Sequence, residues 1–501
     1  MTHIPTVLAF DLGAGSGRAM IGELVENPAG GRKQLKMTEV HRFSNTPVRI
    51  GEHLHWNTLG LLQEIKTGIS KAFQLGYKPE SCAIDTWGVD FGLLDANGEL
   101  LGIPYHYRDR QTEGLVEELS DKLGAERLFA ESGLQFMPFN TLYQLYAMKK
   151  ANSPKLDAAK TLLLTPDLLN YFLTGRMACE FTMATTTQLY DPGKKAWNRA
   201  LMQELGLPDS IFIDPVQPGT EIGALTEEIS TELGVPRLKV MAAASHDTES
   251  AAAAVPFSSE TFAYLVCGTW SLLGTPMKQP LLHSEVLKQD FSNEGGAGGT
   301  FHLLKNIMGL WILQESKRIW ELEGQSLTYP QLVAEAEASE PFRSLIDPDD
   351  LRFMNPDSMP EEIVSYCRDT GQPEPRTIGE TVRCILESLA LRYRMVLEQA
   401  EHLTGAAFEG LHMVGGGIQN ELLCRFTAGA IGRPVWTGPV EASAIGNMLV
   451  QLQAAGYLAD MQEGVELVKA SFPISTYEPE QQAEWQNAYA RYQQLMEVMP
   501  C

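Results

Sequence analysis

The sequence predicts an α/β protein built from two domains. Its 501 residues exceed the roughly 100–200 residues of a typical single domain, and 44% of them are hydrophobic, enough for two cores. Strand-like apolar runs alternate with amphipathic helical patterns, which is typical of α/β domains. A strand–turn–strand pattern at residues 6–24 also has a weak counterpart at 262–276. We therefore expect two domains, 1–250 and 251–501, that each begin with the same hairpin and face each other across a cleft, although hairpins are common and the repeat alone leaves duplication open.

The first half begins with apolar runs that predict strands, TVLAFDLG from residue 6 and AMIGELV from residue 19. The spacing of apolar residues over 59–73 predicts a helix, and SCAIDTWGVDFGLLD (81–95) predicts two strands around a polar and aromatic segment. Residues 110–205 are rich in helical patterns. A strand over 237–242 and a helix that begins near 249 end this half.

The second half is predicted in the same way. AYLVCGTWSLLGTP (263–276) reads as two strands around a Gly-Thr turn, and helical patterns dominate from residue 301. LHMVGGGIQNELLCRFTAGAIG (411–432) reads as a strand, a triple-glycine loop and a helix. The acidic stretch at 478–500 predicts a terminal helix that packs back on the second domain.

Composition excludes several classes of function. With 39 Lys+Arg against 63 Asp+Glu, the formal charge is −24, which opposes binding to nucleic-acid phosphates or to an anionic membrane surface. The seven cysteines form no CxxC pair, so a zinc or dithiol site is not expected. No basic leader and no long apolar span is present, and we expect a cytoplasmic protein. A phosphate-bearing substrate would have to be bound by local groups, namely backbone amides, a metal ion or a few cationic side chains.

A candidate phosphate-binding segment runs from Asp11 to Arg18, with the sequence DLGAGSGR. A strand delivers Asp11 to its end, and three glycines at alternate positions let backbone amides converge on an anion. The segment matches neither a P-loop nor a dinucleotide fingerprint. We interpret it as a phosphate clamp in which Asp11 holds Mg²⁺ through water. A plain glycine-rich turn is the alternative.

Three further segments could serve the same chemistry, and each has a simpler explanation. Ser-His-Asp-Thr-Glu (245–249) precedes a helix, where such residues are favoured as caps, but a carboxylate there could also accept a hydroxyl proton during phosphoryl transfer. Thr269 in CGTWS could bind phosphate or simply form a turn. The glycines at 415–417 could admit a flat ring or connect a strand to a helix.

Two more segments could contact a small polar substrate. DTWGVDF (85–91) offers aromatic walls and carboxylates to a sugar, or core aromatics beside surface acids. LKNIMGLW (304–311) reads mostly as a helix face, with Asn306 at its start. No Ser/His/Asp triad and no metal-binding histidine spacing can be identified.

Taken in order over nearly the whole chain, these segments resemble the FGGY family of carbohydrate kinases. DLGAGSGR and CGTWS resemble its two phosphate motifs, and VGGGIQN its adenosine motif. IDTWGVDFGLLD, PFNTLYQL, TTTQL, SHDT, FSNEGGAGG, LKNIMGLW and GPVEASAIGN resemble the branch whose members phosphorylate L-rhamnulose. The resemblance implies two ribonuclease H-like domains of the actin/hexokinase/Hsp70-type ATPase class around a central cleft. It also implies a reaction, transfer of a phosphoryl group from ATP to O1 of L-rhamnulose with Mg²⁺, in L-rhamnose catabolism.

The resemblance also implies roles for individual residues. Asp247 would be the catalytic base. The ATP-binding residues would be Ala14, Gly15, Ser16, Gly17, Arg18, Thr269, Gln314 and Gly416. The sugar-binding residues would be Gly88, His246, Asp247, Thr248 and Asn306. ATP and L-rhamnulose would be the partners, with no obligate protein partner.

Two features depart from the family pattern or depend on it. Gly15 stands where related loops commonly carry Ser, so the amide is kept and a hydroxyl contact is lost. Cys367 and Cys384 match a cysteine pair that is bridged in similar chains, but a cytosolic location opposes a disulfide.

Other functions remain as alternatives. The substrate could be another ketose or polyol, such as L-fuculose, L-xylulose or L-ribulose, since one methyl group changes binding by only ~1–3 kcal/mol. A nucleotide-switched binding protein of the same fold would hydrolyse ATP without sugar and would carry an extra partner region, which we do not find. A silent sugar sensor would not need Asp11, Asp247 and Thr269 together.

Overall fold

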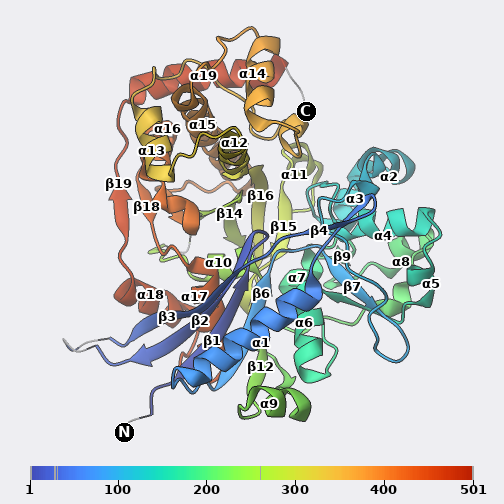
Figure 1. The fold of residues 1–501 in the computed structure, drawn as a ribbon. Coiled ribbons are helices and arrows are strands. Elements are labelled where there is room, and N and C mark those ends of the chain that lie inside the picture. The colour runs from blue at the N-terminus through green and yellow to red at the C-terminus, as the bar shows by residue number, and fades with distance from the viewer. Residues whose placement is uncertain (1–2, 28–29, 31, 260, 499–501) are drawn as a thin grey trace. The chain divides into compact units, whose positions relative to one another are not determined.

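The computed structural model describes residues 3–27, 30, 32–259 and 261–498 (Figure 1). The chain forms two compact units. Unit 1 consists of Met1–Pro256, Pro276–Leu303 and Glu441–Phe472, and unit 2 of Phe257–Thr275, Leu304–Val440 and Pro473–Cys501. Each unit therefore draws on separate stretches of sequence. The predicted division at 250/251 stays a prediction.

Unit 1 is organised on a six-stranded mixed sheet. Its strands lie in the order β11 (Glu221–Ala224), β12 (Lys239–His246), β6 (Ser81–Thr86), β1 (Thr6–Leu12), β2 (Ser16–Val25) and β3 (Gln34–Ser44). The three central strands, β12, β6 and β1, are parallel, and the outer ones are antiparallel to their neighbours. The carboxyl ends of β1, β6 and β12 therefore lie at one edge of the sheet.

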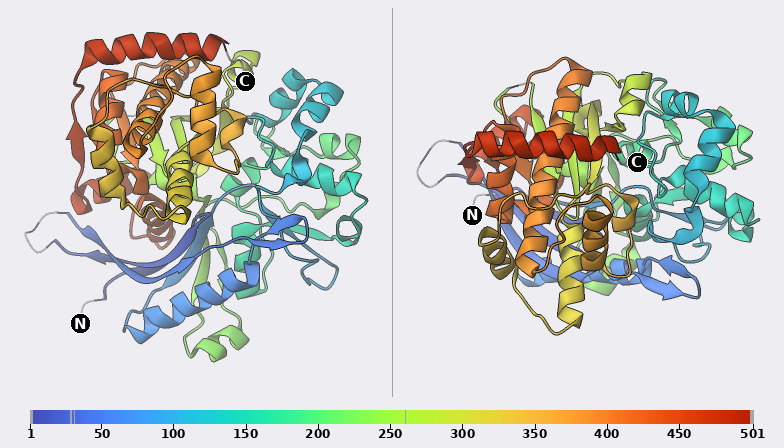
Figure 2. Two further views of the ribbon diagram at one scale, coloured as in Figure 1. Left: turned by 45° about the horizontal axis from the view of Figure 1, so that its top comes forward. Right: turned by 90° about the horizontal axis from the view of Figure 1, so that it is seen from above.

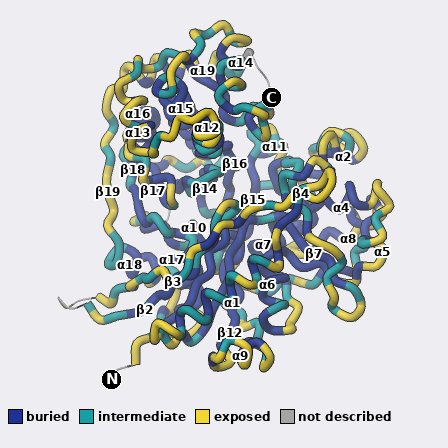
Figure 3. The backbone as a smooth tube through the Cα atoms, in the orientation of Figure 1, coloured by how far each residue is buried: buried dark blue, intermediate teal, exposed yellow. Residues whose placement is uncertain are grey.

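The strands of this sheet send alternate residues to opposite faces, because side chains alternate along a strand. Leu8, Phe10 and Ile84 join one core with α1 (Thr58–Gln74) and α6 (Thr165–Thr174). The intervening residues face α17 (Ala442–Ala454), which packs on β1, β6 and β12. In Figure 3 the central strands appear as buried. This alternation sends Asp11 and Asp85 to the α17 side.

The other elements of unit 1 connect or cover the sheet, and between residues 110 and 205 most of them are helices, as predicted. The strands are β4 (Val48–Ile50), β5 (His53–His55), β7 (Phe91–Leu94), β8 (Thr161–Leu164), β9 (Tyr190–Asp191), β10 (Ala196–Trp197) and β15 (Ser292–Gly295). The helices are α2 (Leu115–Leu123), α3 (Ala125–Ser132), α4 (Thr141–Lys150), α5 (Pro154–Ala158), α7 (Phe181–Thr185), α8 (Arg199–Glu204), α9 (Glu227–Leu233), α10 (Asp247–Ala253), α11 (Ser284–Lys288) and α18 (Met461–Ser471).

Unit 2 contains most of a second mixed sheet, with strand order β15-β16-β14-β13-β17-β18-β19. Its strands are β13 (Ala263–Cys267), β14 (Trp270–Met277), β16 (Phe301–Met308), β17 (Leu411–Val414), β18 (Val435–Thr437) and β19 (Ser475–Tyr477). Its helices are α12 (Trp311–Leu322), α13 (Tyr329–Glu337), α14 (Met359–Asp369), α15 (Ile378–Thr404), α16 (Glu421–Ile431) and α19 (Gln482–Val498). Helix α19 packs on α15 and α16 (Figure 2), which confirms the predicted terminal helix.

The two sheets share one topology. In unit 1, β1 forms a hairpin with β2 and pairs in parallel with β6, and the antiparallel strand β11 pairs with β12 at the edge of the sheet. In unit 2, the hairpin β13–β14 is joined by parallel pairing of β13 with β17, and β18 pairs with antiparallel β19. The weak similarity of the two hairpins in sequence therefore reflects a repeated arrangement of strands.

One prediction of secondary structure was wrong. Residues 301–308 form strand β16, so Asn306 lies on a strand and does not start a helix. The strand is buried along almost its whole length. A continuous apolar run of this kind cannot be distinguished from a buried helix by periodicity alone. Within the described residues, no helix is both long enough and apolar enough to cross a bilayer.

Helix α17 lies very close to α10 at Gly446. A Cβ atom built there would be 1.7 Å from the backbone oxygen of Ser250, so a side chain forces the helices apart. We expect Gly446→Val to destabilise unit 1 by about 1–3 kcal/mol, seen as a lower thermal midpoint in calorimetry. Gly464→Ala in α18 is the control, since its added methyl would have only ordinary contacts with Leu449. An unchanged midpoint for Gly446→Val would contradict the close packing.

Candidate active site

Carboxylates gather at the carboxyl edge of the parallel strands in unit 1. Asp11 on β1 and Asp85 on β6 are direct register partners, and Asp247 follows β12 immediately as the first residue of α10. Asn447 on α17 donates to Asp85 Oδ2 at 2.7 Å. Gln451, one turn further along α17, donates to the Leu8 carbonyl and to Asn447 Oδ1. Helix α17 thus completes this edge with amide donors.

These carboxylates are perturbed by burial and by one another. Burial raises the pKa of Asp11 to about 6, with Arg18 opposing the rise and Asp247 adding to it. Burial and the charge of Asp11 raise the pKa of Asp85 well above its usual value. Burial also raises the pKa of Asp247, against the lowering effect of His246. Raised carboxylate pKa values of this kind are typical of functional sites that bind a cation or transfer a proton.

The glycine-rich loop joins β1 to β2 as predicted. The Gly13 amide donates to the Ser16 carbonyl at 2.9 Å, and Asn45 bonds the carbonyls of Gly13 and Gly15. In the described part of the chain, the amides of Ala14 and Gly15 have no hydrogen-bond acceptor. These two N–H groups are therefore available to an anion.

Arg18 lies on β2 beside this loop. Its Nε is 3.4 Å from Asp11 Oδ2, and its Nη1 pairs with Glu441 Oε2. Two carboxylates thus restrain the guanidinium, which reduces the side-chain entropy lost when an anion binds.

His246, Asp247 and Thr248 form the second half of the unit 1 site. The His246 ring lies with Nε2 3.7 Å from Asp247 Oδ1, and the Thr248 hydroxyl lies 3.4 Å from the same oxygen. The Asp247 side chain is 28% exposed, whereas that of Asp11 is 9% exposed. Of the three strand-edge carboxylates, Asp247 is thus the one a substrate hydroxyl can reach most easily.

The backbone that carries these residues is held by groups that sequence reasoning missed. Glu180 is fully buried, caps α7 through the amides of Thr182 and Met183, and accepts from the Ser245 amide at 3.2 Å. The Thr182 hydroxyl oxygen accepts from the His246 amide at 3.0 Å. The available signal was Glu180, which caps the short helix that leads into the TTTQL segment. It fixes the end of β12 and hence the direction of Asp247.

Gly88 lies in an unusual turn after β6. Val89 has φ of 68°, which is a rare conformation for a β-branched residue. The turn is closed by a bond from the Asp90 amide to the Gly88 carbonyl at 2.8 Å, and Thr186 and Thr141 bond the Val89 amide and carbonyl. Strain of this kind persists where the surroundings over-determine the backbone, typically at functional sites.

The carboxylate of Asp90, in the same segment, is bound by other groups of the protein. It accepts hydrogen bonds from both indoles of the stacked pair Trp56 and Trp87, from Gln144 and from the Tyr107 amide. These bonds from within the protein hold the buried carboxylate in place, and the expectation that it takes sugar hydroxyls stays a prediction.

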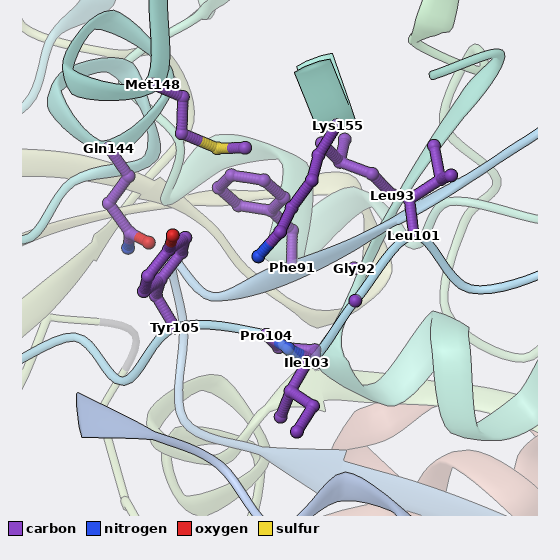
Figure 4. Close-up of a pocket in the computed structure, with 11 residues that line it drawn as sticks. Phe91, Gly92, Leu93, Leu101, Ile103, Pro104, Tyr105, Gln144, Met148 and Lys155 are labelled. Atoms are coloured by element: carbon purple, nitrogen blue, oxygen red, sulfur yellow. The ribbon is translucent and has the colours of Figure 1, made fainter. Parts of the chain in front are cut away.

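A small pocket lies beyond Asp90, between β7, the chain at 101–105 and helices α4 and α5 (Figure 4). Gln144, Tyr105 and Lys155 are among its lining residues, and Lys155 Nζ lies 4.9 Å from the ring centroid of Tyr105. Its lining residues include none of the predicted site residues.

Unit 2 brings together several of the predicted nucleotide-binding residues. The Thr269 hydroxyl donates to Gln314 Oε1 at 3.1 Å, and the Trp311 amide bonds the Thr269 carbonyl at the start of α12. The glycines after β17 pack on the same hairpin, because a Cβ at Gly417 would meet Cys267 Sγ. Gly416 beside it is exposed. Asn306 lies on β16, a neighbour of β14 in the sheet.

The two cysteines singled out in unit 2 are buried free thiols in mutual contact. The thiol of Cys384 lowers the pKa of Cys367, and contact with Cys367 raises the pKa of Cys384 well above its usual value. The disulfide stays a prediction that non-reducing mass measurement can test.

A second acidic group lies next to Asp247. Ligand atoms of His246, Glu249 and Glu294 lie within 4.8 Å of one another, close enough for a metal ion. The same groups are also close enough for ion pairs, since His246 Nδ1 is 3.0 Å from Glu294 Oε2 and His302 Nδ1 is 2.8 Å from Glu249 Oε2. Among the described residues, however, these two carboxylate oxygens form no hydrogen bond.

The comparison with family models decides the family. Residues 6–254 match the N-terminal domain and residues 263–455 the C-terminal domain of the FGGY family of carbohydrate kinases. The chain belongs to the FGGY family. The two family models and the fold shared with a solved sugar-kinase structure confirm the predicted two-domain α/β fold, and the kinase relatives confirm the enzyme class.

Relatives of this FGGY kinase match over nearly its whole length. It is 43% identical to a rhamnulokinase of Bacteroides thetaiotaomicron over 97% of this chain and 98% of that protein. It is 41% identical to a rhamnulokinase of Pectobacterium carotovorum, over 98% and 97% of the two chains. Among solved structures, a gluconate kinase from Lactobacillus acidophilus has the same fold, with a TM-score of 0.79 at 15% identity, covering 99% of this chain and 98% of the other.

The strained turn at Val89 yields a test in this FGGY kinase. Thr186→Val removes the acceptor of the buried Val89 amide, and such a loss costs about 1–3 kcal/mol. We expect a lower thermal midpoint and a higher KM for sugar. Thr67→Val is the control, because the Thr67 hydroxyl only bonds back to the Gln63 carbonyl within α1. Equal effects of the two substitutions would show that the turn does not depend on Thr186.

Proposed function

We propose that this FGGY kinase transfers the γ-phosphoryl group of ATP to O1 of L-rhamnulose, with Asp247 as the base. The observation that carries the proposal is the partly open Asp247 carboxylate at the carboxyl edge of three parallel strands, in a chain whose relatives are rhamnulokinases along their whole length. L-Rhamnulose 1-phosphate and ADP are the expected products.

Asp247 accepts the proton of the sugar O1 hydroxyl as the bond to phosphorus forms. Phosphoryl transfer needs positioning and charge stabilisation more than covalent catalysis, so one oriented carboxylate suffices. The raised pKa of Asp247 makes it a stronger base than an exposed carboxylate, and the positive charge of the neighbouring His246 limits that rise.

The phosphates of ATP are assigned to the loop Ala14–Gly17 and Arg18. The two amides without acceptors in this loop suit phosphate oxygens, and Arg18 adds a restrained positive charge. In unit 2, Thr269, Gln314 and Gly416 are assigned to the nucleotide, because Thr269 and Gln314 already contact each other and Gly416 leaves bare backbone.

Mg²⁺ fits the carboxylates at the strand edge. Carboxylate oxygens and water are the ligands it prefers, and Asp85 Oδ1 is a buried oxygen with no hydrogen-bond partner among the described residues. Asp11 would hold the ion through water. When bound, the ion neutralises phosphate charge, which lets a chain of formal charge −24 bind ATP.

The sugar is assigned to Gly88, His246 and Thr248 of unit 1, which also carries Asp247, and to Asn306 of unit 2. Gly88 is half-exposed at the strained turn, where a Cβ would press on Thr186 at 3.0 Å. His246 and Thr248 supply donors beside the base.

The first test is a sugar panel with Asp247→Asn. We expect L-rhamnulose to exceed L-fuculose, L-xylulose, L-ribulose and glycerol by about tenfold or more in kcat/KM, which a few well-placed pocket contacts can provide. Asp247→Asn should lower kcat by about 10²–10⁴-fold, because the base is lost. Mg²⁺-dependent ADP release measures both. Preference for another sugar would overturn the substrate, and sugar-independent ADP release that Asp247→Asn leaves unchanged would overturn the kinase itself.

The second test separates the nucleotide from the sugar. Thr269→Val removes one hydroxyl that we assign to a charged phosphate, and such bonds are worth about 1.5–3 kcal/mol. We expect KM for ATP to rise about 10- to 100-fold while KM for sugar stays within about twofold. Initial rates at varied ATP and varied sugar give both constants. A rise in the sugar KM instead would contradict the assignment of Thr269.

A further inference from the structure

Glu294 is a buried carboxylate for which the proposed reaction gives no role. It lies on β15 within the FSNEGGAGG segment and is only 5% exposed. The neighbouring backbone is anchored, since the Gly295 amide donates to Thr185 Oγ1 at 2.8 Å and the Gln135 amide to Ser292 Oγ at 3.1 Å. Glu294 is thus held in place by the helix α7 that also supports the end of β12.

The carboxylate faces the ring of His246. Glu294 Oε2 lies 3.0 Å from His246 Nδ1, while Nε2 of the same ring lies 3.7 Å from Asp247 Oδ1. The other nearby acid, Glu249, is paired with His302 at 2.8 Å. The imidazole therefore stands between one fully buried carboxylate and the partly open carboxylate of the base.

We propose that Glu294 is a positioning residue of the phosphoryl-transfer site, which fixes the His246 ring and its charge beside Asp247. The proposal rests on the function proposed above. Glu294 touches neither sugar nor nucleotide in this scheme and acts through His246.

The charge on the ring follows from its surroundings. Burial lowers the pKa of His246, but the adjacent Glu294 carboxylate, followed by the charges of Asp247 and Glu249, raises it to about 9. The ring is then an imidazolium at neutral pH, and its charge lowers the pKa of Asp247. The charged or titratable groups around the pair are Glu294, Glu249, His302, Asp11, Asp85, Arg18 and Glu180.

The sign of the pH effect can be worked out from these groups. Without the Glu294 charge, the pKa of His246 falls, but a fall of about one unit from about 9 leaves the ring charged at neutral and acidic pH. Asp247 then keeps the His246 cation and loses only the direct effect of Glu294, which raises its pKa. Removing Glu294 should therefore lower the pKa of both groups and move the pH profile of kcat/KM to lower pH.

The experiment compares Glu294→Gln and Glu294→Ala with Glu285→Gln in the full chain. Glu285 is a half-exposed carboxylate on α11 and controls for the loss of one negative charge. The readouts are the His246 pKa by NMR of labelled histidine, kcat, both KM values and the pH profile. The His246 signal is identified by its absence in His246→Gln.

We expect the His246 pKa to fall by about one unit or more in Glu294→Gln, as for other histidines that lose a carboxylate partner. The kcat value should fall about 10-fold in Glu294→Gln and about 100-fold in Glu294→Ala, because glutamine keeps an acceptor for the ring and alanine does not. KM for ATP should stay within about twofold, and the pH profile should move to lower pH only in the Glu294 variants.

Two results would overturn the proposal. An unchanged His246 pKa with an unchanged pH profile would leave Glu294 a merely structural group, whatever its thermal midpoint. About one equivalent of a transition metal in the purified protein, lost in Glu294→Gln, would make the cluster a metal site instead. The NMR readout needs no substrate, so it stands apart from failure of the proposed reaction with L-rhamnulose.

Discussion

The carboxylates of Asp11, Asp85 and Asp247 share one edge of a sheet, and burying them together is the constraint on which the rest of the site depends. Parallel strands β1, β6 and β12 bring them there, and burial with like charge raises the pKa of each. Compensation comes from every side: Arg18 from β2, Asn447 from α17 and the His246 ring from β12. An unpaired buried charge costs several kcal/mol, so these partners have to be in place before any substrate arrives. A phosphate-bound cation would reduce the remaining repulsion between these carboxylates. The same buried charges that are costly to the folded protein would therefore favour binding of the cation with its phosphate.

A second layer of polar groups gives this edge its rigidity. Glu180 and Thr182 bond the backbone at the end of β12, and Thr186 and Thr141 hold the strained turn at Val89. Asp90 is saturated by indole, amide and backbone donors. None of these side chains needs to touch a substrate. Their buried hydrogen bonds fix the positions of residues that do, and in a low-dielectric interior such bonds leave little freedom for rearrangement.

Local signals in the sequence were enough to place the two hairpins, the helix at 58–74, the triple-glycine loop and the terminal helix, because each depends on neighbours close in the chain. The family resemblance supplied the fold class and the roles of the site residues. Asn306 was placed on a helix because a strand buried on both faces has no diagnostic period. Glu180, Asn447 and Glu294 were missed for a different reason: each acts on residues dozens to hundreds of positions away, at a distance no local pattern can register.

Helix α17 also has a consequence for synthesis on the ribosome. Residues 441–472 complete unit 1, yet they are made after most of unit 2. At roughly 5–20 residues per second, the α17 face of β1, β6 and β12 stays uncovered for about ten seconds or more while the intervening chain emerges. During that interval the nascent sheet exposes Ala83, Met241 and Ala243 together with its acidic edge. The negative charge of the carboxylates at this edge, which is costly in the folded site, would then repel neighbouring nascent chains. Association of those chains with the uncovered face of the sheet would be disfavoured.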